Sequence, residues 1–109
     1  MIYATFVQDG RHVDYTPLSD VAAGTVVVQG ELVGITTRDI PANTLGSLAV
    51  EGIFDIQTDG TVVNTGVKAY WLAAQKVATG SDGGGANKYL GKLVRPFGDG
   101  STVRIRLSQ

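Results

Sequence analysis

The sequence predicts an all-β protein, a single small β-barrel or β-sandwich of about nine short strands. Short runs rich in β-branched and aromatic residues follow one another along the chain. Pairs that favour tight turns, such as Asp9-Gly10 and Asp59-Gly60, separate these runs. No segment shows the apolar spacing of an amphipathic helix. We therefore expect one sheet-based domain with an extended N-terminal arm.

The clearest strand pattern lies at residues 48–57, where apolar and polar side chains alternate. This period of two is typical of a half-buried strand. The apolar positions are Leu48, Val50, Phe54 and Ile56, and the polar positions are Glu51, Asp55 and Gln57. A glycine inside a strand usually marks a bulge or a bend. One long strand that curves at Gly52 is therefore expected.

The N-terminal segment, residues 2–7, has the composition of a strand but alternates poorly, so neither face is marked as the solvent face. Residues 12–16 alternate well, with Val13 and Tyr15 predicted to point inward. Pro17 ends that strand. A loop with at most one helical turn is expected over the next residues, up to position 24.

A tight hairpin is predicted for residues 26–29 and 32–37, connected by Gly30-Glu31. Its unbroken valines favour a strand that is covered on both faces. Residues 38–44 form a connecting loop, because Pro41 biases the residue before it towards an extended conformation.

The C-terminal half contains two more predicted hairpins, preceded by a short helical turn at residues 61–66. Residues 68–72 pair with 75–78, and residues 89–95 pair with 102–107. In the last strand, the residues predicted to point to the core are Val103, Ile105 and Leu107.

The composition fits a single folded domain over residues 1–109. The chain is 43% hydrophobic and 17% charged, which argues against disorder. It has no cysteine, and this excludes disulfides and thiolate metal sites. No apolar run approaches the roughly 20 residues of a membrane-spanning helix, and the N-terminus lacks the features of a signal peptide. A soluble protein made inside a cell, without a membrane partner, is expected.

The net charge of −1 hides an uneven distribution of charges along the chain. Residues 1–75 carry three basic and eight acidic side chains, whereas residues 76–109 carry six basic and two acidic ones. One interpretation is a basic face for an acidic partner. The other, which the sequence favours, is that both halves interleave in one sheet and their charges mix.

The glycines before Gly91-Lys92 invite comparison with a phosphate-binding loop. The comparison fails, because Ala86 stands where the first glycine belongs and Leu93 replaces the Ser/Thr that would reach magnesium. A strand, not a helix, is predicted to follow. We expect no nucleotide site there.

The remaining candidates for catalysis or metal binding are isolated. His12 is the only histidine, and with Asp9 and Asp14 it does not supply the convergent ligands that a metal requires. Glu51 and Asp55 lie roughly 13 Å apart along a strand, too far for a retaining carboxylate pair. We therefore expect no catalytic residue, no metal site and no cofactor, and the protein is not expected to be an enzyme.

A basic and aromatic strip in the C-terminal strands gives an alternative function, a small β-barrel that binds nucleic acid. The residues of this strip are Tyr89, Lys92, Arg95, Arg104 and Arg106. Because the whole chain is slightly acidic, nucleic acid is not the expected partner.

Six short segments, taken in order, resemble the DUF2190 family of tailed-phage capsid cement, or head decoration, proteins. They are Phe6-Val7-Gln8-Asp9-Gly10, Val13-Asp14-Tyr15-Thr16, Val21-Ala22-Ala23-Gly24, Val50-Glu51-Gly52-Ile53-Phe54, Gly66-Val67-Lys68-Ala69-Tyr70-Trp71 and Val103-Arg104-Ile105-Arg106-Leu107. The resemblance runs essentially from end to end of the chain. At Val67-Lys68-Ala69 the chain departs from the family, which more typically has Gly-Asp-Lys-Val before Tyr-Trp.

The resemblance implies a structural protein of the virion, made in the host cytoplasm, that binds the outer surface of the phage head. Its implied role is to stabilise contacts between subunits of the major capsid protein. By analogy it also implies a homotrimer, with dimer and monomer as alternatives. Strand addition is a common way to bind a partner chain. We therefore expect the N-terminal arm to contact the capsid through Met1, Ile2, Tyr3, Ala4, Thr5, Phe6 and Val7.

Overall fold

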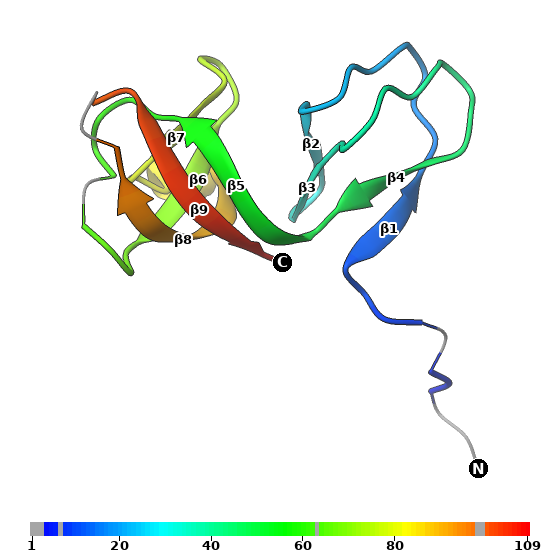
Figure 1. Ribbon diagram of the computed structural model, residues 1–109, viewed down its shortest axis with the longest axis horizontal. Coiled ribbons are helices and arrows are strands. Elements are labelled where there is room, and N and C mark those ends of the chain that lie inside the picture. The colour runs from blue at the N-terminus through cyan, green and yellow to red at the C-terminus, as the bar shows by residue number, and fades with distance from the viewer. Residues whose placement is uncertain (1–3, 7, 63, 98–99) are drawn as a thin grey trace.

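A computed structural model of the chain describes residues 4–6, 8–62, 64–97 and 100–109. Over these residues the chain forms nine strands in two antiparallel sheets, and the all-β prediction is confirmed. Figure 1 shows the sheets side by side, with the N-terminal segment extending away from both. The sheets do not close into a barrel. The fold is an open arrangement of two sheets.

The first sheet has four strands in the order β1-β4-β3-β2. Its strands are β1 (His12–Tyr15), β2 (Val26–Gln29), β3 (Leu32–Ile35) and β4 (Gly46–Ala49). The predicted hairpin of β2 and β3 is confirmed, with Val26 opposite Ile35. The prediction that its valines are covered on both faces is wrong, because β2 is an edge strand and Val28 is 39% exposed.

The second sheet has five strands in the order β5-β9-β8-β6-β7. Its strands are β5 (Glu51–Gln57), β6 (Lys68–Leu72), β7 (Val77–Thr79), β8 (Lys88–Pro96) and β9 (Thr102–Ser108). Both predicted hairpins are formed. β7 begins two residues later than expected, because a turn occupies residues 73–76 and Lys76 adopts a positive φ of 57°. A 3-10 turn, η1 (Gly83–Gly85), lies between β7 and β8.

The short helical turn expected at residues 61–66 is absent among the described residues there, and the loop expected at residues 18–24 forms without a helical turn. At residues 61–66, with Val63 outside the described residues, the chain runs beside β8, and the Gly66 amide donates to the Leu93 carbonyl at 2.8 Å. At residues 18–24 a β-bridge between Val21 and Ile40 replaces the turn. In both places pairing with a distant segment satisfies some of the backbone groups that a helix would have paired locally.

The long strand predicted at residues 48–57 is divided between the two sheets. Val50 joins β4 to β5 and is 6% exposed. Its amide donates to the carbonyl of Arg11 at the start of β1, and its carbonyl accepts from the amide of Gln109 beyond β9. The chain bends just after this point, where Gly52 has a φ of 133° that other residues rarely adopt. The bend expected at Gly52 therefore lets one strand serve two sheets.

The main core lies on the inner face of the second sheet. Val103, Ile105 and Leu107 of β9 are at most 1% exposed, as the alternation predicted. From the first sheet, Val33 and Ile35 of β3 pack into the same cluster. The second sheet also curls, so that Thr58 after β5 makes an isolated parallel bridge with Ala78 in β7. The two sheets thus share one core.

The side-chain amide of Gln109 ties the two sheets together. Its oxygen accepts from the Val33 amide in β3 at 2.9 Å. Its nitrogen donates to the carbonyls of Tyr89 and Leu90 in β8, at 2.8 and 2.9 Å. One side chain therefore satisfies backbone groups of both sheets that would otherwise lack these partners.

We expect Gln109→Ala to lower the free energy of unfolding by about 2 kcal/mol, because partly buried backbone groups lose their hydrogen bonds. Urea unfolding followed by circular dichroism measures this change. Gln29→Ala is the matched control, since Gln29 is exposed at the edge of the first sheet. Equal stability of the two variants would show that the amide of Gln109 does not join the sheets.

Candidate functional site

The N-terminal arm is the most exposed apolar segment that the sequence singled out. Its described residues, Ala4, Thr5 and Phe6, are all exposed, and Phe6 is 71% exposed. They form no strand, although the composition is strand-like. Met1, Ile2, Tyr3 and Val7, which were also predicted to contact the capsid, lie outside the described residues. The segment leads away from the body (Figure 1), so its described side chains are available to a partner.

The basic residues of the predicted strip lie mainly on the outer face of the second sheet. Strand pairing places Lys68 of β6 opposite Lys92 of β8, and Lys92 opposite Arg106 of β9. Arg106 is in turn opposite Ile53 of β5. Side chains directly opposite one another share a face, with Cβ atoms about 5 Å apart. These four residues thus form one row across four strands, called here the cationic row.

A second row, two residues along β9, contains a charged pair and an aromatic platform. Arg104 donates to both carboxylate oxygens of Asp55, at 2.8 and 3.2 Å. This hydrogen bond holds the pKa of Asp55 below its ordinary value. The guanidinium groups of Arg95 and Arg104 lie 4.8 and 5.3 Å from the centre of the Phe97 ring. Two of the strip's arginines therefore already have partners within the chain.

Tyr89 is not part of this exposed strip. Its ring is half-buried and lies edge-on to the ring of Tyr70, with centroids 6.0 Å apart. A stacking platform for single-stranded nucleic acid requires exposed aromatic faces beside the cations. The arrangement of Tyr89 does not supply one, and the alternative function gains no support from it.

The sequence pattern alone does not identify Ile53, Lys68 and Phe97 as members of this face. Phe97 was assigned to a turn, and Lys68 was assigned to a different hairpin from Lys92. Ile53 breaks the alternation of β5 as an apolar residue at a solvent position, and it is 61% exposed. That break in the pattern was the signal that could have identified it. The two cations become neighbours only through the pairing of β6 with β8.

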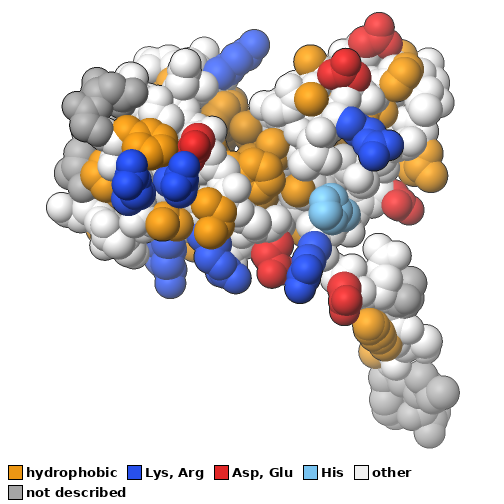
Figure 2. Space-filling model, viewed as in Figure 1, with side chains coloured by type: hydrophobic (Ala, Val, Ile, Leu, Met, Phe, Trp, Pro, Cys, Tyr) orange, Lys and Arg blue, Asp and Glu red, His pale blue; other side chains and the backbone are white. Residues whose placement is uncertain are grey.

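The charges of the chain mix in part, as the sequence favoured, because the second sheet interleaves β5 and β6, from residues 1–75, with β8 and β9, from residues 76–109. The first sheet is built from residues 12–49 alone and is mainly acidic, whereas the second, from residues 51–108, holds charges of both signs, with Asp55 paired to Arg104. Figure 2 shows Lys and Arg side chains gathered over the half that carries β5–β9, and Asp and Glu mainly over the other half. One ion pair joins the halves, between Lys88 and Glu31 at 2.8 Å.

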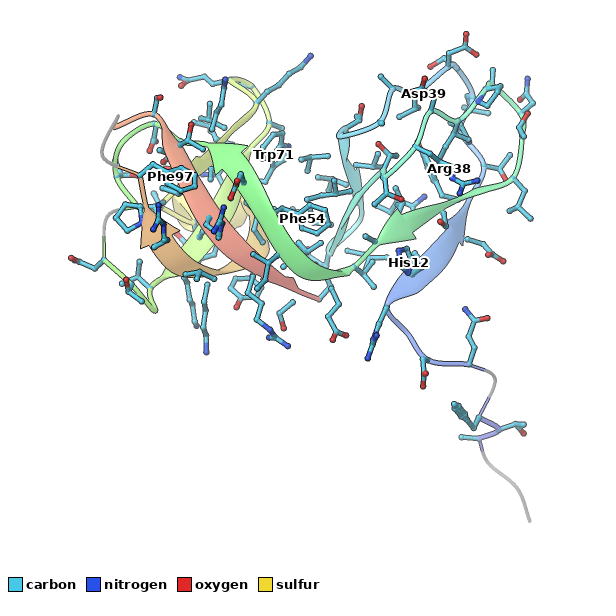
Figure 3. All side chains as sticks on the ribbon, viewed as in Figure 1. His12, Arg38, Asp39, Phe54, Trp71 and Phe97 are labelled. Carbon is cyan, nitrogen blue, oxygen red and sulfur yellow. The ribbon has the colours of Figure 1, made fainter. Side chains whose placement is uncertain are left out.

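A cleft of about 290 Å³ lies between the sheets. Phe54 and Trp71 of the second sheet point towards the first sheet (Figure 3), where Val26 and Ile35 line the other wall. Trp71 also packs against the main core. The cleft is thus an extension of the packing between the sheets.

The candidates for acid–base or metal chemistry remain dispersed. His12 lies on β1 and lines a shallow depression with Asp14 and Arg38. Glu51 and Asp55 point to solvent from β5. Among the described residues, no group of three or more His, Asp or Glu side chains is arranged to hold a metal ion. No described helix is long and apolar enough to cross a membrane.

Comparison with protein families identifies the chain. The family model of the phage cement proteins matches residues 7–109, nearly the whole chain. The chain belongs to the phage cement protein family. No curated protein and no solved structure matches it.

Membership in the cement family gives this two-sheet protein a structural role in association with the phage capsid. The family is structural, not enzymatic, and the dispersed His12, Asp14 and Glu51 fit that role. The match begins at residue 7, so six of the seven predicted arm residues precede the matched region. The family match therefore does not bear on the arm, and its proposed role rests on the residues of this chain.

Proposed function

We propose that this cement protein decorates the outer surface of a phage head and stabilises the contacts between neighbouring subunits of the major capsid protein. The observation that carries the proposal is an exposed apolar arm on a firmly packed body of the cement family. A reinforcing protein needs a body that keeps its shape and a segment that can join another chain. The shared core and the arm supply these two parts.

In this proposal the arm, residues 1–7, contacts the capsid. Phe6 is its described anchor, because an aromatic ring that leaves water on binding contributes strongly to affinity. The body then lies on the shell as a homotrimer at three-fold or quasi-three-fold positions. Many modest contacts, repeated over the head, add up to a large stabilisation of the shell. The protein is made in the host cytoplasm and joins the outside of the assembled head.

Co-sedimentation with undecorated, expanded heads, followed by electron cryo-microscopy of the pellet, tests this function. We expect the protein in the pellet and regular density on the outer surface at subunit joints. Heads with bound protein should also withstand heating or chelation better than bare heads. Protein that stays in the supernatant at every salt concentration, or density only inside the shell, would contradict the proposal.

A further inference from the structure

The cationic row is an unusual arrangement for a free surface. Lys68, Lys92 and Arg106 are directly opposite one another on three adjacent strands, and all three are exposed. Like charges in this position repel and destabilise a sheet. No ion pair to another described residue relieves these three cations, whereas Arg104 and Lys88 each have an acidic partner. The acidic residues of the same strand face, Glu51 and Asp55, each lie one row away, and Asp55 is paired with Arg104.

The row also has an apolar end. Ile53 lies opposite Arg106 and is 61% exposed, on a strand face that otherwise carries Glu51, Asp55 and Gln57. Protein interfaces combine exposed aliphatic or aromatic side chains with charges that fix orientation. The row presents one exposed isoleucine and three unpaired cations. A partner surface that fits it is acidic and carries an apolar patch.

The first sheet carries a surface of that kind, at the end formed by two neighbouring loops. Here it is called the acidic end, and it consists of Asp20 and Asp39 together with Leu18, two residues before Asp20. Both aspartates line one depression of about 380 Å³, together with Val21 and Pro41. Leu18 is 91% exposed.

The loops at the acidic end brace one another, so the charges are held in place. Asp20 Oδ1 accepts from the Ala42 amide and Asp39 Oδ1 accepts from the Ala23 amide, each at 2.8 Å. The Val21–Ile40 bridge lies between these contacts. Each carboxylate keeps its second oxygen for another donor. A long cationic side chain can lay its aliphatic stem on Val21 and Pro41 while its charge approaches the carboxylates.

We infer that the cationic row of one copy binds the acidic end of a second copy, in a head-to-tail contact. The two surfaces belong to different sheets on opposite halves of the molecule (Figure 1, Figure 2), so one chain cannot satisfy both by itself. A head-to-tail contact uses two different patches and leads to a closed ring or to an open chain of copies. The inference concerns contacts between copies and does not depend on how the arm binds a capsid.

Sedimentation velocity of the purified full chain, without capsids, tests this inference. At about 10 mM salt the Debye length is about 30 Å, and at 1 M it is about 3 Å. We expect the wild-type protein to associate at low salt as its concentration rises, and to dissociate at high salt. A wild-type protein that stays monomeric at low salt over the whole concentration range would overturn the inference.

Two charge variants make the test specific. The first, K68E/K92E/R106E, makes the cationic row acidic. The second, L18K/D20N/D39N, makes the acidic end basic, and its asparagines keep the side-chain oxygens that brace the loops. Each variant alone should associate at least tenfold more weakly than wild type, because like charges now meet. An equal mixture should associate again, since each variant offers the surface that the other lacks.

The mixture separates this inference from the alternatives. Thermal melting of each variant confirms that it is folded before association is compared. If neither variant weakens association, or the mixture does not restore it, the head-to-tail contact is wrong. Binding of a single-stranded oligonucleotide by a monomeric wild type would assign the row to polyanions instead. Loss of head binding by K68E/K92E/R106E, with a monomeric wild type, would assign it to the capsid protein.

Discussion

Gly91→Ala is expected to lower the free energy of unfolding by about 4 kcal/mol, the largest effect of a Gly→Ala change among the described glycines. A Cβ at position 91 would collide with the backbone carbonyl of Arg106 and approach the Cα of Leu107 at 3.1 Å. These are backbone atoms of β9, so no side-chain rotation can relieve the clash. Gly91 is also buried at the centre of the second sheet, between β6 and β9.

Because small domains are stable by only about 5–15 kcal/mol, this variant should be largely insoluble or unfold at low urea. Urea unfolding and the soluble yield measure the effect. Gly10→Ala is the matched control, since nothing lies within 4 Å of its added Cβ and its stability should change by no more than about 0.5 kcal/mol. Gly34→Ala should fall between them, because its clash is with the side chain of Leu48. Similar stability of the Gly91 and Gly10 variants would refute the close approach of β8 and β9.

Gly91 also shows what sequence reasoning could and could not establish. The sequence showed that the residues around Gly91-Lys92 do not match a phosphate-binding loop, and the strand expected to follow is formed as β8. It did not reveal why a glycine stands there, since the reason is the backbone of β9, which pairs with this position through Leu107. A requirement imposed by a distant strand leaves no local pattern.

The same distinction applies to β4 and β5. Alternation predicted correctly that Leu48, Val50, Phe54 and Ile56 are buried or half-buried and that Glu51, Asp55 and Gln57 are exposed, whereas Ala49, on the exposed parity, is buried. It could not predict that the strand changes sheets at Val50, because this depends on hydrogen bonds with Arg11 and Gln109 at opposite ends of the chain. Local periodicity thus predicts which side chains of residues 48–57 are buried, whereas long-range hydrogen bonds decide which sheet each part of the segment joins.

Strand β2 illustrates how the order of strands decides exposure. Its valines have the composition of a fully covered strand, but β2 stands at the edge of the first sheet, and Val28 is partly exposed. The cationic row shows the same limit for the candidate sites. The sequence identified Lys92 and Arg106 as basic strand residues, but only the pairing with β6 adds Lys68 and turns them into a continuous row.

Deletion of residues 1–7 is expected to abolish binding to phage heads and to leave the melting temperature of the body unchanged. The described arm residues are exposed and form no strand with the body, so their loss removes little that stabilises the fold. If the arm provides the anchor, binding should lose at least about 2 kcal/mol, a factor of about 30 in affinity. Co-sedimentation with undecorated heads and a thermal melt of the same preparation measure both quantities.

Phe6→Ala separates the contribution of the described anchor from that of the arm as a whole. We expect it to weaken head binding by about tenfold or more, because the side chain is 71% exposed in the free protein and can leave water only in a complex. Val28→Ala is the control, since it also shortens an exposed apolar side chain but lies on the body, at the edge of the first sheet.

If the variant that lacks residues 1–7 decorates heads as well as wild type does, the body and not the arm binds the capsid. The arm's exposed Phe6 would then need a different explanation.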